Sequence, residues 1–171
     1  MAAFHDAGAT VAVVTAKDKL RTLLAKGLDV ASGRAVAFSA EKADRASRGE
    51  NGIDDLLETL GRPLPEVYSA DLSEFVMAAG VHLLEMRRPD LMYLSTTDYI
   101  QHKAAPGTPV ADAFYAMLDG YVGALDAAGC TLVLTADHGM NDKHEADGSP
   151  AVIYLHALLD EADPPQPIGG S

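Results

Sequence analysis

The chain has 171 residues, 48% of them hydrophobic and 22% charged, a composition typical of a globular domain and not of a disordered chain. Its 25 acidic and 13 basic residues give a formal net charge of −12, which argues against nucleic acid or an anionic membrane as a partner. Cys130 is the only cysteine, so the chain excludes an intramolecular disulfide and a metal cluster built from thiolates.

The first part of the chain combines short apolar runs with helical patterns. Two buried strands are predicted over residues 10–15 and 34–38, and helices over 2–8 and 17–27. Residues 39–68 are mostly polar and contain several glycines and prolines, with one short helix predicted over 53–60. We interpret residues 39–68 as a possible cap or excursion from the main domain.

The second part continues the same alternation. Helices are predicted over 71–87 and 108–129, and strands over 89–95, 131–136 and 151–155. Short, nearly continuous apolar strands that alternate with helices are typical of an α/β fold, with a mostly parallel sheet covered by helices on both faces. We therefore expect one α/β domain over residues 1–160, followed by a flexible tail over residues 161–171.

Three polar clusters follow predicted strands: TAKDK, STTDYIQH and ADHGMNDKH. In open α/β sheets, functional sites form beyond the carboxyl ends of the strands. The sequence therefore predicts that these clusters share one edge of the sheet.

Two of the clusters contain pairs of metal-ligating residue types. Asp98 and His102 are four residues apart, so a helix beginning directly after the strand would place both side chains on one face. Asp137 and His138 are adjacent, and Gly139 allows the backbone to bend there. Carboxylate oxygen and imidazole nitrogen together suit zinc, with manganese or iron as alternatives.

The combination of VVTAKDKL, STTDYIQHK and TADHGMNDKH resembles the phosphonoacetate hydrolases of the alkaline phosphatase superfamily, over roughly residues 9–160. The resemblance implies an alkaline phosphatase-like core with two zinc ions. Asp98 and His102 match two ligands of one ion, and Asp137 and His138 match two ligands of the other. Lys17 and Lys19 match the lysines that hold the substrate carboxylate, so the expected partner is a small phosphonate.

The chain departs from this pattern at its two ends. The nucleophilic threonine of the family and a nearby aspartate ligand would precede Met1, and a further histidine ligand would follow Ser171. We therefore assign no catalytic nucleophile and expect no turnover by the chain alone. Thr96 and Thr97 are interpreted as the end of a strand. His144 is a candidate to form hydrogen bonds with the metal ligands without binding the metal itself.

Two alternatives remain open at this level. The chain could belong to another hydrolase of the superfamily, acting on phosphate monoesters or diesters, or it could be an inactive metal-binding fragment. No apolar run reaches the roughly 18 residues of a membrane span, and the N-terminus lacks the basic region of a signal peptide. We therefore expect no membrane partner and a cytoplasmic location, with a homodimer possible.

Overall fold

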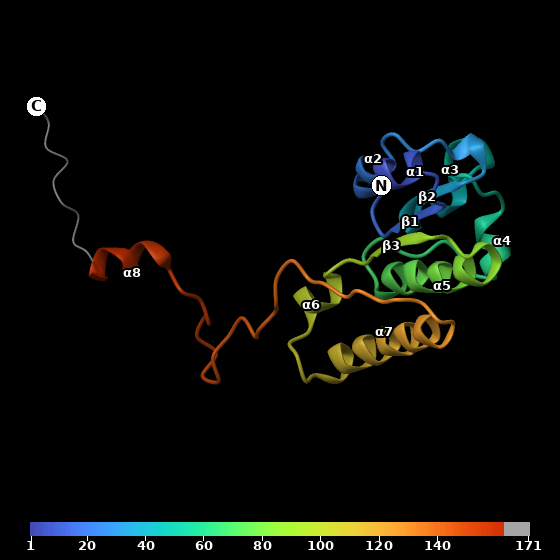
Figure 1. The fold of residues 1–171 in the computed structure, drawn as a ribbon. Coiled ribbons are helices and arrows are strands. Elements are labelled where there is room, and N and C mark those ends of the chain that lie inside the picture. Colours follow the sequence, from blue (N-terminus) through green and yellow to red (C-terminus); the bar gives the residue numbers. More distant parts are fainter. Residues whose placement is uncertain (163–171) are drawn as a thin grey trace, which may run out of the picture.

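Three parallel strands form the central sheet of the structure, a computed structural model that describes residues 1–162 (Figure 1). The strands are β1 (Val11–Thr15), β2 (Ala35–Ser39) and β3 (Leu91–Ser95), and their order in the sheet is β2-β1-β3. All residues of β1 and β2 are buried, as their continuous apolar sequences predict. Most of the predicted tail, residues 163–171, lies outside the described residues.

Helices cover both faces of this sheet, which confirms the predicted α/β class. Alternate residues of a strand point to opposite faces. On one face Val11 and Val13 pack near α1 (Ala2–Asp6) and α2 (Asp18–Leu24), against residues such as Leu24. On the other face the larger core joins strand residues to α5 (Ala70–Arg87), whose Phe75 is 1% exposed.

The connections around the sheet are short helices. They are η1 (Val30–Ser32), η2 (Ala40–Arg45), α3 (Arg48–Asn51), α4 (Leu56–Leu60) and α6 (Tyr99–Lys103). The long helix α7 (Pro109–Ala127) packs against α5, and the Thr108 hydroxyl accepts a hydrogen bond from the Ala111 amide, as expected for its predicted role as N-cap. Figure 1 shows α7 on the side of α5 that faces away from the sheet.

The predicted strands over 131–136 and 151–155 are wrong, because within residues 1–162 no strand follows β3. Neither segment joins the sheet, and their apolar side chains are exposed: Val133 is 86% exposed and Ile153 is 77% exposed. After α7 the chain first runs back beside α5 and α7 and then extends away from them toward its C-terminal end (Figure 1). Within the described residues β3 is paired only with β1, so its outer edge stays unpaired and neither segment forms a ladder with it. The chain ends its described part in α8 (Leu155–Ala162).

None of the helices within residues 1–162 combines the length and the apolar character that crossing a lipid bilayer requires.

Candidate metal centre

The carboxyl ends of β1 and β3 lie side by side and bring two of the predicted clusters together. Thr15 pairs with Ser95 at the end of both strands, and the Ala16 amide donates a hydrogen bond to the Ser95 carbonyl over 2.8 Å. Lys17 follows this point on one strand, and Asp98 follows it on the other. The parallel register therefore places TAKDK and STTDYIQH at one edge, as predicted.

Asp98 and His102 lie on one face of α6. The chain turns helical directly after the β3 segment, with Asp98 at the N-cap position, and the His102 amide donates to the Asp98 carbonyl over 3.0 Å. His102 Nε2 lies 2.8 Å from Asp98 Oδ2. Both side chains are about half-exposed, so the pair is open to solvent and to an entering ion.

His138 approaches the same carboxylate from a segment about forty residues later in the chain. Its Nε2 atom lies 3.8 Å from Asp98 Oδ2 and 3.8 Å from Asp137 Oδ1. Asp98 thus lies close to both histidines, whereas Asp137 contacts only its sequence neighbour His138 among the four predicted ligands. Asp137 is the most exposed of them, at 93%.

A hydrogen bond at Nδ1 fixes the orientation of the His138 ring. His138 Nδ1 lies 2.9 Å from the Gly139 carbonyl oxygen, so Nδ1–H can donate there while Nε2 faces the carboxylates. This hydrogen bond to Gly139 is the main cause that raises the pKa of His138 above its ordinary value of 6.5, followed by the charge of Asp137. A backbone carbonyl bound to one nitrogen is the usual arrangement behind a histidine that binds a metal through the other.

The types of donor atom at this edge suit a divalent metal ion. It offers carboxylate oxygens and imidazole nitrogens on one open edge, and the His138 ring is turned so that Nε2 is the nitrogen available to an ion. Nevertheless, within residues 1–162 no three or more His, Cys, Asp or Glu side chains are arranged around a common point that one ion could occupy. The pairs Asp98–His102 and Asp137–His138 are therefore two separate candidate pairs, linked by the approach of His138 to Asp98.

The two lysines predicted to bind substrate differ in their surroundings. Lys17 precedes α2, and its Nζ atom lies 3.5 Å from Glu41 Oε2 and 5.1 Å from the centre of the Tyr68 ring. Lys19 is exposed on α2, and in the described part of the chain its side chain forms no ion pair or hydrogen bond. Only Lys17 is thus held in place by neighbouring side chains.

His144 does not contact the four predicted ligands within the described residues. Its backbone forms an isolated antiparallel bridge with Pro150, and its amide donates to Asp142 Oδ1 over 3.1 Å. The neighbouring Lys143 reaches the centre instead, because its Nζ atom lies 3.3 Å from His102 Nδ1. The supporting role of His144 stays a prediction.

Sequence reasoning missed Ser73, which anchors the loop that carries Asp98. Ser73 lies in α5 and is 1% exposed, and its hydroxyl oxygen accepts a hydrogen bond from the Thr97 amide over 3.1 Å. Thr97 therefore belongs to a turn after β3, which ends at Ser95, and not to the strand. In the sequence, the feature that could have identified Ser73 is a polar serine on the buried face of a predicted helix.

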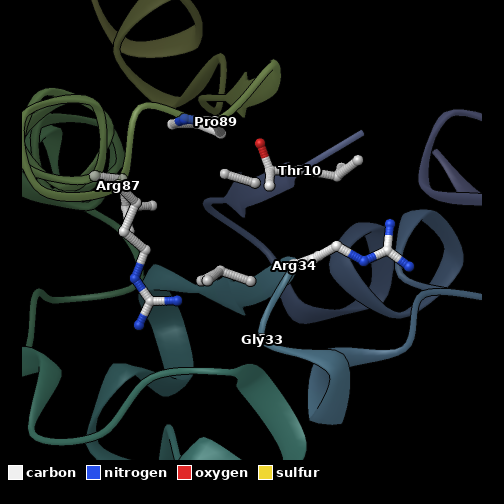
Figure 2. A pocket seen from close by; sticks show the side chains of 9 residues that line it. Thr10, Gly33, Arg34, Arg87 and Pro89 are labelled. Atoms are coloured by element: carbon white, nitrogen blue, oxygen red, sulfur yellow. The ribbon is translucent and has the colours of Figure 1, made fainter. Parts of the chain in front are cut away.

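A cavity lies at the opposite edge of the sheet. It has a volume of about 290 Å³ and is formed near the amino ends of the strands, where Thr10, Arg34 and Pro89 precede or begin them (Figure 2). The guanidinium groups beside it are engaged elsewhere: Arg34 donates to the His5 carbonyl and Arg87 to the Gly52 carbonyl. This cavity is thus separate from the candidate metal centre.

Comparison with known proteins places the chain in a family. A family model described as Type I phosphodiesterase / nucleotide pyrophosphatase matches residues 17–165. Two crystal structures of phosphonoacetate hydrolase from Sinorhizobium meliloti 1021, in complex with phosphonoformate and with phosphonoacetate, each show 66% sequence identity and a TM-score of 0.83. The matches cover 93% and 94% of this chain but only 38% and 39% of those chains. These similarities confirm the resemblance seen in the sequence, and the chain belongs to the type I phosphodiesterase/nucleotide pyrophosphatase family of hydrolases.

Proposed function

We propose that this chain forms part of a zinc-dependent hydrolase that cleaves the carbon–phosphorus bond of phosphonoacetate. The observation that carries the proposal is the meeting of Asp98, His102 and His138 at the edge of the sheet that also carries Lys17. The 66% identity to phosphonoacetate hydrolase supports this substrate.

The reaction converts phosphonoacetate and water into acetate and phosphate. A nucleophile forms a bond to phosphorus while the carbon–phosphorus bond breaks, and the electron pair of that bond passes to the methylene carbon. The neighbouring carboxylate delocalises this charge as an enolate before the carbon takes up a proton. Lys17 and Lys19 would hold that carboxylate, so their positive charges stabilise the enolate as it forms.

Asp98 and His102 would hold one zinc ion, and Asp137 and His138 a second. Bound zinc supplies Lewis-acid chemistry, because it neutralises phosphoryl oxygens and lowers the pKa of an attacking hydroxyl group or water. Manganese and iron accept the same donor types, and metal analysis of the purified protein distinguishes the three.

A phosphodiesterase or phosphatase activity is the second candidate, because the matching family model is named for phosphodiesterases and pyrophosphatases. The two candidates differ in what they require of the lysines. A substrate with a carboxylate needs Lys17 and Lys19, whereas a phosphate ester needs the metal ligands alone. If substitution of the lysines changes both activities to the same extent, or changes neither, the second candidate is therefore favoured.

Turnover is best tested in a chimera in which this chain replaces the matching segment of the Sinorhizobium meliloti enzyme. We expect phosphate release from phosphonoacetate, at least a hundredfold loss in Asp98→Asn, and a larger loss for phosphonoacetate than for a phosphate diester in Lys17→Ala. His156→Ala serves as a control, since this histidine lies on α8 and is exposed. A folded chimera that binds zinc but releases no phosphate would refute the proposal.

A further inference from the structure

Lys17 is contacted by residues from both ends of the 39–68 excursion. Glu41 follows β2, where the excursion begins, and its carboxylate lies 3.5 Å from Lys17 Nζ. Tyr68 stands where the excursion returns, just before α5, and its ring centre lies 5.1 Å from the same atom. Two residues that are far apart in sequence therefore restrain one flexible lysine side chain.

Glu41 is itself held firmly. Its Oε1 atom accepts a hydrogen bond from the Asp18 amide over 2.6 Å, and its own amide donates to the Ala16 carbonyl over 3.2 Å. The carboxylate thus has a fixed position on one side of Lys17. The ammonium group of lysine has three N–H donors, so a single carboxylate neighbour leaves donors for a further anion.

The Tyr68 ring connects Lys17 with the metal centre. Its centre lies 6.1 Å from that of the Tyr99 ring, and Tyr99 directly follows Asp98 at the start of α6. Tyr68 is nevertheless 76% exposed, so burial of its ring in the core does not explain its place. The contacts that it does make are a lysine ammonium within cation–π range and a second aromatic ring.

We propose that Tyr68 is a positioning residue for Lys17, which it holds toward the carboxylate group of the substrate. The inference rests on the proposed function, because it assumes that Lys17 binds that carboxylate. A lysine loses considerable side-chain freedom when it is fixed, and a lysine restrained before binding loses less of it on binding. The face of the ring supplies this restraint, and the phenol hydroxyl group is not needed for it.

The experiment compares ligand binding by the zinc-loaded 171-residue chain and its variants, with ³¹P chemical shifts as the readout. Phosphonoacetate carries the carboxylate, and methylphosphonate is the matched probe without it. We expect Tyr68→Leu to weaken phosphonoacetate binding about two- to fivefold, the range of an exposed cation–π contact, and to leave methylphosphonate binding unchanged. Tyr68→Phe keeps the ring and should bind both probes as the wild type does.

A second measurement reports on Lys17 directly. The ε-methylene protons of Lys17 should be shifted upfield by the ring current in the wild type and in Tyr68→Phe, but not in Tyr68→Leu. Tyr154→Leu is the control, since Tyr154 is similarly exposed, at 71%, and its ring contacts His156. This signal does not depend on ligand binding, so it separates the position of the lysine from its use.

The outcomes distinguish the inference from the proposed function. If Lys17→Ala weakens phosphonoacetate binding but Tyr68→Leu does not, the positioning role of Tyr68 is refuted and the proposed function stands. If Lys17→Ala binds both probes as the wild type does, the proposed function fails and the inference fails with it. Loss of the carboxylate preference in both variants supports both.

Discussion

The loop that carries Asp98 depends on one buried hydroxyl group, and Ser73→Ala tests this dependence. Ser73 lies within α5, and its oxygen is the acceptor for the Thr97 amide at 3.1 Å. The contact between the two hydroxyl oxygens is longer, at 3.5 Å, and contributes little. The variant therefore removes one backbone anchor next to a predicted metal ligand and leaves the predicted ligands themselves intact.

The expected loss of stability is small. One hydrogen bond contributes about 1 kcal/mol, and alanine regains about 0.5 kcal/mol through its better helix propensity. We therefore expect the free energy of unfolding to fall by about 0.5–1 kcal/mol. The effect on zinc binding should be larger, because an unanchored residue costs about 1–2 kcal/mol to order again, which corresponds to roughly five- to thirtyfold weaker binding.

Both quantities can be measured on the chain: the free energy of unfolding by urea titration, and zinc affinity by competition with a chromophoric chelator. Ser69→Ala is the matched control, because it removes a serine hydroxyl at the N-cap of the same helix that donates only to the Glu66 carbonyl. If Ser73→Ala binds zinc as tightly as Ser69→Ala does, the loop is not positioned by Ser73 and the reasoning is wrong.

Four further predictions concern the predicted metal ligands and the core. Asp98→Asn should lower zinc affinity at least tenfold in the chelator assay, and Asp119→Asn on the exposed face of α7 should not; equal affinities would contradict the site. Zinc binding should weaken as the pH falls, because protonated imidazole cannot bind a metal, and this loss should begin above pH 6.5 because the pKa of His138 is raised. Asp137→Asn removes one cause of the raised pKa and should lower the pKa of His138 in an NMR titration of the metal-free chain, and an unchanged pKa would count against the contact between the two side chains. Phe75→Ala should cost about 3–5 kcal/mol of unfolding free energy in urea titration, since Phe75 is 1% exposed between α5 and the sheet, and a loss below 1 kcal/mol would refute the packing.

Sequence patterns predicted the elements whose determinants are local. The continuous apolar runs of β1 and β2 indicated fully buried parallel strands, and the spacing of Asp98 and His102 indicated a shared helical face. The same kind of apolar run at 131–136 indicated a strand that the structure lacks. A sequence pattern shows that residues favour a strand, but it does not show which neighbouring strand will supply their hydrogen bonds.

The sequence also did not predict the contacts between distant segments. Nothing in the spacing of Glu41, Tyr68 and Lys17 indicates that they meet, because the path of residues 39–68 is set by the packing of short helices such as α4. His138, by contrast, lies near Asp98 although the strand expected before it is absent. Its position therefore depends on contacts with the start of α6, and not on membership of the sheet.

The contacts that hold His138 near α6 are weak, so they do not fix its position as firmly as the core fixes Asp98. His138 and Asp98 are about half-exposed and 3.8 Å apart, and exposed ion pairs of this kind add little to stability because solvent screens them. Lys143 adds one similar contact, between its Nζ atom and His102 Nδ1 at 3.3 Å. The β3–α6 turn, in contrast, is joined to the core through strand pairing and the buried Ser73. In the proposed site, folding alone would therefore set Asp98 and His102, whereas metal binding would supply most of the free energy that fixes Asp137 and His138 beside them.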